Sequence, residues 1–333
     1  MTGIVRASDQ MRSGDGDGSG ETTELELEYI KDLTNYESKE KCVVTLGKFD
    51  GVHRGHRKLI SRVRAMARRQ KCRAAVFTFD VAPQIRLGER KKQMLMTNAE
   101  RSAFLHDCSI DLLVECPFTP EIRGMEPEQF VTEILLKKLH VSGVVAGTDY
   151  RFGKDRAGTA FFLQEMGEKY GFSVEIIEKE MDGDREISST YIREELAAGH
   201  VAKVRELLGY PYFVTGEVVH GRHLGHSLGF PTLNQIPDPS KMLPPNGVYF
   251  SLTEVAGKTY QGISNIGYKP TVGSEVLGIE TYLFDCSLDL YGQMAKVELL
   301  EFRRPEKKFA GIDELKNQMD EDIQAADRYF LTV

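Results

Sequence analysis

The sequence predicts two domains of different class, an N-terminal Rossmann-like α/β domain with a parallel sheet and a C-terminal antiparallel β-barrel with a terminal helix. A chain of 333 residues exceeds the usual size of one hydrophobic core. Up to about residue 208, apolar strands alternate with amphipathic helical segments, a pattern typical of βαβ units. Beyond that point, short β-rich runs are separated by Gly, Pro and Asn, which is typical of a barrel. We therefore expect a flexible leader over residues 1–24 and domains over 25–208 and 209–333.

Composition excludes several classes of protein. Residues 1–22 are rich in Gly, Ser and Asp and cannot bury enough apolar surface to fold. The net charge of −7 argues against general nucleic-acid binding, and no apolar run is long enough to span a bilayer. The five cysteines form no C-x-x-C pair, and most lie within apolar runs, as reduced thiols do. We expect a cytoplasmic protein, and the sequence leaves its oligomeric state open.

The elements of the N-terminal domain follow from apolar periodicity. The first βαβ unit combines a strand at residues 42–46, a helix at 57–70 and a strand at 74–79, with a right-handed crossover. The basic face of this helix is more typical of a solvated surface than of a site. The remaining expected strands are 111–115, 141–146 and 173–177, and the remaining helices are 98–106, 127–139, a segment ending at 170, and one continuous helix ending near 208.

The turn after the first strand reads Thr45-Leu-Gly-Lys-Phe-Asp-Gly-Val-His-Arg-Gly-His56. A helix N-terminus offers backbone N–H groups and a favourable dipole to an anion, and glycines let a ligand approach the main chain. Histidine side chains there can donate hydrogen bonds to phosphate oxygens during group transfer. The spacing fits neither a P-loop nor a dinucleotide-binding glycine motif. Ordinary helix capping and a zinc site are the alternatives, although no Cys or His partners stand at zinc-ligand spacing.

Two further strings are expected near the same sheet edge. Gly147-Thr-Asp-Tyr-Arg-Phe-Gly153 follows a strand parallel to the first, so both loops open beyond strand carboxyl ends. A turn packed by aromatic side chains is its alternative explanation. Ile187-Ser-Ser-Thr-Tyr-Ile-Arg193 places hydroxyls at a helix start, where they cap the helix or bind phosphate. Capping alone does not explain Arg193, whose charge opposes the helix dipole unless an anion is bound.

The C-terminal domain is expected to contain strands at 213–219, 247–254, 259–266, 280–286 and 295–302, followed by a helix at 312–330. That helix caps the barrel or serves as a dimer element. Between the first two strands lies the glycine-punctuated string from Gly221 to Asn234, which includes Gly225 and Gly229. A glycine loop can wrap phosphates, and the oxygens of Thr232 and Asn234 suit Mg²⁺.

These motifs together resemble one known family. Phe49-Asp-Gly-Val-His-x-Gly-His and Ile-Ser-Ser-Thr-x-Ile-Arg resemble the nucleotidyltransferase domain of the bacterial bifunctional riboflavin kinase/FAD synthetases. The string from Gly147 to Gly153 resembles Gly-x-Asp-Phe-x-Phe-Gly of the same domain. Gly-Phe-Pro-Thr-x-Asn and the blocks from Pro245 to Gly292 resemble the kinase domain of the same family. The resemblance covers residues from about 42 to 330. It implies that the chain phosphorylates riboflavin with ATP, giving FMN, and then adenylylates FMN, giving FAD and pyrophosphate.

The resemblance also implies residue roles. Catalysis falls to Glu280, the base toward the ribityl hydroxyl, and to His53, His56 and Arg193, which stabilise phosphate charge. ATP or phosphate is expected at Gly47, Phe49, Asp50, Gly51, Gly55, Ser188, Ser189, Thr190, Gly221, Gly225 and Gly229. Flavin or nucleotide is expected at Asp149, Arg151, Phe152 and Asn265, and Mg²⁺ at Thr232 and Asn234. The alternative for Glu280 is an outward residue on an alternating strand.

Two departures keep other functions open. Lys48 stands where the family usually has Asn, Val or Thr, and Ala82-Pro83 stands where it usually has His-Pro. A lysine there can pair with phosphate or obstruct the pocket, and the missing histidine removes a donor. One alternative is therefore a kinase with a degenerate N-terminal domain, and another is a non-catalytic regulator that binds flavin.

Overall fold

The computed structural model describes residues 27–80, 93–221, 230–271 and 274–332. These residues form two compact units, and the division falls between Ile187 and Ser188, with residues 93–97 belonging to the second unit. The whole of the expected leader, residues 1–24, and Ala82 lie outside the described residues. Among the described residues no helix has the length and apolar character that a bilayer crossing requires.

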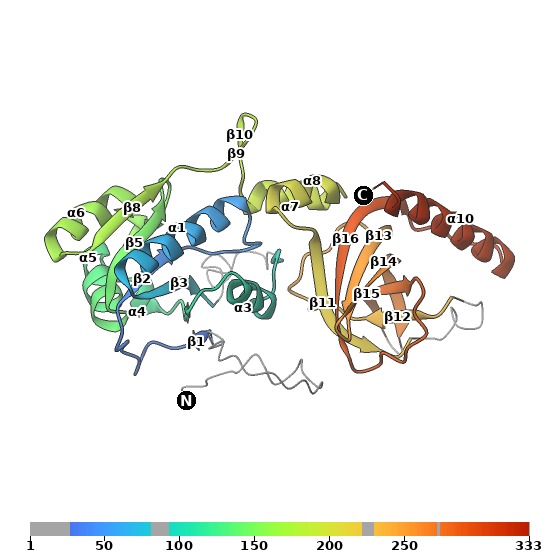
Figure 1. The fold of residues 1–333 in the computed structure, drawn as a ribbon, viewed down its shortest axis with the longest axis horizontal. Coiled ribbons are helices and arrows are strands. Elements are labelled where there is room, and N and C mark those ends of the chain that lie inside the picture. The colour runs from blue at the N-terminus through green and yellow to red at the C-terminus, as the bar shows by residue number, and fades with distance from the viewer. Residues whose placement is uncertain (1–26, 81–92, 222–229, 272–273, 333) are drawn as a thin grey trace. The chain divides into compact units, whose positions relative to one another are not determined.

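The first unit is built on a six-stranded parallel sheet with the order β1-β4-β3-β2-β5-β8 (Figure 1). Its strands are β1 (Glu28–Ile30), β2 (Cys42–Leu46), β3 (Arg73–Phe79), β4 (Leu112–Cys116), β5 (Val141–Gly147) and β8 (Ser173–Ile177). The parallel sheet is confirmed, and β1 is an additional edge strand that the sequence analysis missed. Its three residues are too few to show a period. The ladder between β2 and β5 puts the loops after these two strands at the same edge.

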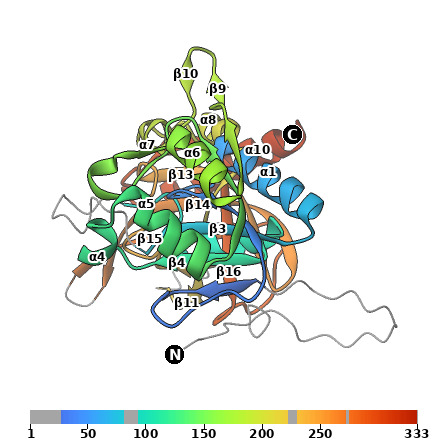
Figure 2. The ribbon, with the colours of Figure 1, turned by 90° about the vertical axis from the view of Figure 1, so that its left-hand side faces the viewer.

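Helices cover both faces of this sheet, as apolar residues on both sides of every central strand require (Figure 2). On one side α1 (Arg54–Gln70) buries Ile60, Val63 and Met66. The helix α3 (Asn98–Asp107) stands between β3 and β4 in the chain. On the other side Leu163 of α6 (Ala160–Tyr170) and Phe130 share a core with Val44 and Phe77. The remaining short elements are α4 (Pro120–Arg123), β6 (Arg151–Phe152), η3 (Lys154–Arg156), β7 (Gly158–Thr159), β9 (Met181–Asp182) and β10 (Arg185–Glu186).

Two expected helices differ from the structure. The segment predicted at 127–139 is a short α5 (Pro127–Gln129) that continues as a π-helix, η2 (Phe130–Lys138). The single helix expected to end near residue 208 is two helices, α7 (Ser189–Ala197) and α8 (Val201–Leu208). Gly199, with φ of 82°, interrupts them in a conformation that a helix interior does not allow.

The second unit contains a closed antiparallel barrel with the strand order β11-β12-β15-β14-β13-β16, which confirms the expected barrel. The strands are β11 (Tyr212–Val219), β12 (Thr232–Gln235), β13 (Gly247–Val255), β14 (Lys258–Thr271), β15 (Ser274–Leu283) and β16 (Met294–Pro305). Strand β12 was not expected, since its four residues end the glycine-rich string. The helix α10 (Ile312–Phe330) caps the barrel, where Phe330 packs on Phe284 and Tyr329 on Phe250.

A buried ion pair joins α10 to the barrel. Arg304 of β16 donates from Nη2 and Nε to the carboxylate of Asp322, at 2.7 Å and 2.9 Å from Oδ2. The Asp322 side chain is only 4% exposed. The fork geometry of arginine and the burial of its partner make this contact stronger than a surface ion pair.

Candidate functional site

The turn between β2 and α1 has a strained main chain. Phe49 and Val52 have positive φ values of 48° and 28°, which side chains with a Cβ rarely adopt. The helix begins at Arg54, three residues earlier than expected, and His53 is its N-cap. The Arg57 N–H donates to the His53 carbonyl at 2.9 Å, so His56 belongs to the first helical turn. Sequence periodicity misses this start because Arg54, Gly55 and His56 carry no apolar signal.

The two histidines of this turn lie together. Their rings stack with centroids 3.8 Å apart, and the Phe49 ring lies 4.9 Å from that of His56. The Nδ1 atoms of both histidines are buried and have no hydrogen-bond partner within the described part of the chain. Burial lowers the pKa of His53 from its usual 6.5 to about 4. Burial, and then the neighbouring His53, hold the pKa of His56 well below its usual value. Both rings are therefore neutral at pH 7 and can each donate one N–H.

Glycines make room for these rings. A Cβ on Gly55 would lie 3.3 Å from the His53 ring, and a Cβ on Gly47 would lie 3.1 Å from Cε2 of Phe49. Gly51 has φ of 81°, in the left-handed region that favours glycine. The expected phosphate-binding residues of this string, Asp50 included, thus form one compact turn at the carboxyl end of β2.

The second string, from Gly147 to Gly153, is packed against aromatic side chains of its own unit. Phe152 is buried and contacts the rings of Phe130, Tyr150 and Phe162. Asp149 pairs with Lys179 at 3.0 Å, while the side chain of Arg151 is exposed. The aromatic packing that the sequence offered as an alternative accounts for Phe152. Contact of Asp149 and Arg151 with flavin or nucleotide remains a prediction.

All residues of the third string after Ile187 lie in the second unit. The Ser188 hydroxyl accepts a hydrogen bond from the Tyr191 N–H at 3.2 Å, so Ser188 caps α7. Arg193 donates from Nη1 to the Ser189 carbonyl at 3.0 Å and from Nε to the Gln93 carbonyl at 3.3 Å. These carbonyls give the guanidinium partners without an anion. The expected phosphate contacts of Ser188, Ser189, Thr190 and Arg193 therefore stay a prediction.

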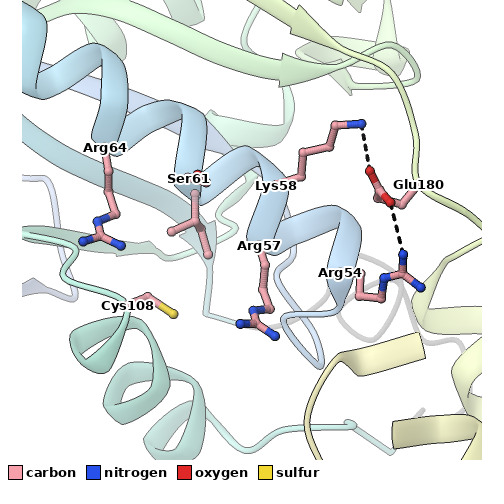
Figure 3. A pocket seen from close by; sticks show the side chains of 8 residues that line it. Arg54, Arg57, Lys58, Ser61, Arg64, Cys108 and Glu180 are labelled. Atoms are coloured by element: carbon pink, nitrogen blue, oxygen red, sulfur yellow. Dashed lines mark ion pairs between the residues drawn. The ribbon is translucent and has the colours of Figure 1, made fainter. Parts of the chain in front are cut away.

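The basic face of α1 lines a cavity of about 360 Å³ (Figure 3). Four cationic side chains border it, together with Ser61, Cys108 and Glu180. The Glu180 carboxylate lies 2.8 Å from Nζ of Lys58 and 3.6 Å from Nη2 of Arg54, and Figure 3 shows it between them. This carboxylate neutralises part of the basic face. The expectation of a solvated face is consistent with the exposure of Arg54 and Arg57.

The barrel brings its expected site residues together. Thr232 Oγ1 donates to Glu280 Oε1 at 2.6 Å. In the ladders, Asn234 of β12 and Asn265 of β14 are both direct neighbours of Glu280 on β15. Residues paired in register on antiparallel strands point to the same face. One carboxylate is thus flanked by two amides and a hydroxyl on one outer face of the barrel.

The same cluster meets the glycine-rich string at Gly221. A Cβ on Gly221 would lie 2.3 Å from Nδ2 of Asn234, so only glycine fits there. Gly225 and Gly229 lie outside the described residues. The oxygens of Thr232, Asn234 and Glu280 form the hard donor set that suits Mg²⁺. Among the residues that the structure describes, no group of three or more His, Cys, Asp or Glu side chains has an arrangement that could hold a metal ion.

Sequence reasoning missed a second carboxylate beside this cluster. Glu306 follows β16 and accepts hydrogen bonds from Nδ2 of Asn246 at 3.2 Å and from Nδ2 of Asn265 at 3.5 Å. Its Oε1 occupies the space beside Gly267, where a Cβ would lie only 1.9 Å away. A charged residue after the last strand resembles ordinary loop chemistry, and only the fold brings it to Asn265.

Comparisons with known proteins cover both units. A family model described as FAD synthetase matches residues 35–191, and one described as riboflavin kinase matches residues 208–330. A bifunctional riboflavin kinase/FMN adenylyltransferase from Escherichia coli K12 is 36% identical over 296 residues, which are 88% of this chain and 94% of the relative. The corresponding protein of Bacillus subtilis is 37% identical over 300 residues, with the same coverage of 88% and 94%.

The fold also matches a solved structure along most of its length. A crystal structure from Streptococcus pneumoniae, described as a macrolide-efflux protein, superposes with a TM-score of 0.81 at 29% identity. The match covers 90% of this chain and 98% of that one. The two-unit architecture therefore has a close structural counterpart.

Proposed function

Since the chain belongs to the bifunctional riboflavin kinase/FMN adenylyltransferase family, we propose how its residues divide the two reactions between two sites. The chain phosphorylates riboflavin with ATP to give FMN, and it transfers AMP from a second ATP to FMN to give FAD and pyrophosphate. The barrel cluster serves the first reaction and the turn between β2 and α1 serves the second. The observation that carries this proposal is that the stacked histidine pair lies in the first compact unit, whereas the cluster around Glu280 lies in the second.

In the kinase reaction, Glu280 takes the proton from the ribityl hydroxyl as that oxygen attacks the γ-phosphorus of ATP, and the bond from this phosphorus to the departing ADP breaks. The hydrogen bond from Thr232, at 2.6 Å, orients the carboxylate. Thr232 and Asn234 would hold Mg²⁺, which would supply charge neutralisation at the phosphates. The glycine string around Gly221 follows the phosphates with its backbone N–H groups. Asn265 contacts the flavin substrate.

In the adenylyl transfer, an FMN phosphate oxygen attacks the α-phosphorus of ATP, and the bond to pyrophosphate breaks. No protein nucleophile is needed because the FMN phosphate is already anionic. His53 and His56, neutral in the free protein, each donate one N–H to phosphate oxygens on which negative charge builds up. Asp50, Gly51 and Gly55 shape the turn. Asp149 and Arg151 meet the flavin or nucleotide.

We further propose Mg²⁺ as the physiological cation and the cytoplasm as the location, with no nucleic-acid or membrane partner. The hard oxygen ligands support the first point. The net charge of −7 supports the lack of a nucleic-acid partner, and the five free cysteines support a reducing cytoplasm.

Two single variants test the division of labour. His56→Ala is expected to slow FAD formation from FMN by about 10²-fold or more and to spare FMN formation from riboflavin. Glu280→Gln is expected to slow FMN formation by about 10²- to 10⁴-fold and to spare FAD formation from supplied FMN. The products are separated chromatographically after incubation with ATP and Mg²⁺. Equal loss of both activities in either variant argues against separate sites.

A further inference from the structure

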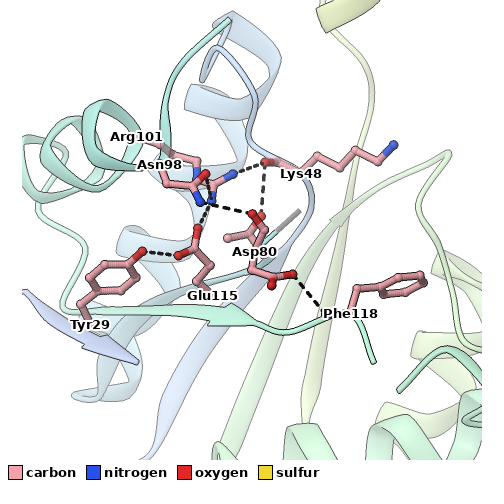
Figure 4. Close-up of polar contacts among 8 residues, drawn as sticks. Tyr29, Lys48, Asp80, Asn98, Arg101, Glu115 and Phe118 are labelled. Carbon is pink, nitrogen blue, oxygen red and sulfur yellow. Dashed lines mark hydrogen bonds and ion pairs between the residues drawn. The ribbon is translucent and has the colours of Figure 1, made fainter. Parts of the chain in front are cut away.

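A buried polar network lies beneath the turn between β2 and α1 (Figure 4). Arg101 of α3 donates from Nη2 to Oε1 of Glu115 on β4, and Tyr29 of β1 donates to the other oxygen of the same carboxylate. The side chains of Arg101 and Glu115 are only 6% and 5% exposed. Burial, and then its hydrogen bond to Glu115, raise the pKa of Tyr29, so its hydroxyl remains a donor. None of these residues belongs to the sequence motifs of the two domains.

The network reaches the turn through one backbone carbonyl. The Lys48 carbonyl accepts hydrogen bonds from Nη1 of Arg101 and from the hydroxyl of Thr78, each at 3.2 Å. Figure 4 shows this carbonyl pointing toward Arg101, while the Lys48 ammonium points away from the network. Asn98 accepts from Nη2 of Arg101 at 3.1 Å and donates to the Asp80 carbonyl at 3.2 Å. Glu115 and Asn98 thus hold the guanidinium in the position from which it donates to the Lys48 carbonyl.

The carbonyl of Lys48 belongs to the peptide whose nitrogen is that of Phe49, the residue with φ of 48°. Reversing this peptide plane would bring the φ of Phe49 into the ordinary negative range and relieve its strain. The reversal would also turn the Phe49 N–H toward the Arg101 guanidinium and Thr78. A guanidinium is a permanent cation with donors only, so it opposes an N–H in that place. Arg101 therefore favours the strained orientation.

The observed orientation leaves a donor available to a ligand. The N–H and C=O of one peptide point in opposite directions. The Phe49 N–H consequently points away from Arg101, and no described residue accepts a hydrogen bond from it. The ring of Phe49 packs on that of His56, which in turn stacks on the ring of His53. Fixing the peptide also fixes the side chain that supports His56.

We propose that Arg101, held by Glu115 and assisted by Thr78, is a positioning residue for adenylyl transfer: it fixes the Lys48–Phe49 peptide so that the Phe49 N–H and His56 meet the ATP phosphates together. Arg101 touches no substrate and acts only through the main chain. The inference rests on the proposed role of this turn, which the His56→Ala variant tests separately. If His56→Ala left FAD formation unchanged, the role of the turn would be refuted whatever the Arg101 variants do.

The test removes the two donors to the Lys48 carbonyl, Arg101 and Thr78, in separate variants, and neither variant leaves a buried charge unpaired. Arg101→Met with Glu115→Leu replaces the ion pair by apolar side chains of similar size, which proteins commonly tolerate. Thr78→Val removes the hydroxyl with little change of shape. Arg73→Met with Glu28→Leu is the matched control, because it removes another Arg–Glu pair of the same sheet, at 2.5 Å, at the opposite end of β3. Riboflavin phosphorylation by the same preparation reports whether the second unit remains intact.

We expect the Arg101/Glu115 variant to lower kcat for FAD formation by about 10- to 100-fold, with KM for FMN changed much less, because the fixed donors act on charge that develops in the transition state. Thr78→Val lowers kcat by about 3- to 10-fold, and its effect is smaller when added to the other variant, since both act on one carbonyl. The control and the kinase rate stay within about twofold.

Unchanged kcat in both folded variants overturns the proposal, as does an equal loss in the Arg73/Glu28 control. A fall in kcat that merely follows the loss of the folded fraction, measured by circular dichroism, also overturns it. If the double variant does not fold, Thr78→Val and Arg101→Lys decide the question. Lysine keeps a charge beside Glu115 but lacks the second donor that reaches the Lys48 carbonyl. The proposal therefore requires the Arg101→Lys variant to have a lower kcat for FAD formation.

Discussion

The histidine pair makes the stability of the first unit depend on pH. The His53 side chain is 7% exposed, and burial lowers its pKa from 6.5 to about 4. Above pH 6.5, His53 is neutral in both the folded and the unfolded chain and contributes no pH dependence. Between pH 6.5 and 4, the unfolded chain binds a proton that the folded chain does not, so the free energy of unfolding falls as the pH falls.

The size of this effect follows from the pKa difference. A difference of 2.5 pH units, from 6.5 to 4, corresponds to about 3 kcal/mol at about 1.4 kcal/mol per unit. His56 acts in the same direction because its pKa is also lowered. His53→Gln should therefore remove part of the acid sensitivity, even where its stability at pH 7.5 is below that of the wild type.

Two measurements check this prediction. Urea unfolding followed by circular dichroism at pH 7.5, 6.5, 5.5 and 4.5 gives the pH slope of stability, which should be smaller in His53→Gln by up to about 1.4 kcal/mol per pH unit. His106→Gln, at an exposed position of α3, is the matched control for the substitution itself. NMR titration of ¹³C-labelled histidines follows the His53 resonance directly. A midpoint near 6.5, or equal slopes in wild type and His53→Gln, would refute the reasoning.

Three further predictions concern the second unit. Gly221→Ala should lower kinase kcat/KM by about 10- to 100-fold, because its Cβ would displace the Asn234 amide 2.3 Å away. The control Gly311→Ala has open space around its Cβ and should leave kcat/KM unchanged. The rate of FMN formation is measured for both variants. Gly267→Ala should expel the Glu306 carboxylate, whose Oε1 would lie 1.9 Å from the new Cβ, and should slow FMN formation by about tenfold while FAD formation from supplied FMN stays unchanged. Asp322→Ala should lower the free energy of unfolding of this unit by about 3 kcal/mol in urea titration, because it leaves Arg304 without its buried partner; an exposed control, Asp320→Ala, should change it by less than about 0.5 kcal/mol.

Much of the architecture follows from sequence periodicity. Strand β2 and helix α10 have the predicted bounds, because the first is an unbroken apolar run and the second a long amphipathic repeat. Periodicity fails where local geometry interrupts a regular pattern. Gly199 divides α7 from α8, and η2 continues α5 as a π-helix although the apolar residues recur as in an ordinary helix.

The candidate sites could be predicted to different extents. Motif resemblance proposed Thr232, Asn234 and Glu280 as candidates, and the barrel ladders bring them side by side. Glu306 and Arg101 could not be found in this way, because each is a common charged residue whose importance depends on a partner distant in the chain. One signal was present: Glu115 interrupts the apolar run Leu-Leu-Val-Glu-Cys, and a carboxylate inside a buried strand requires a partner.

The two sites are held in place by different physical means, and this difference predicts how each responds to mutation. In the barrel, ladder register alone aligns Asn234, Glu280 and Asn265, because neighbouring strands leave each pair one geometry. The turn between β2 and α1 has no ladder, and Phe49 and Val52 lie in costly backbone conformations. Such a turn needs support from outside its own sequence. Substitutions remote from the substrate should therefore impair adenylyl transfer more readily than riboflavin phosphorylation.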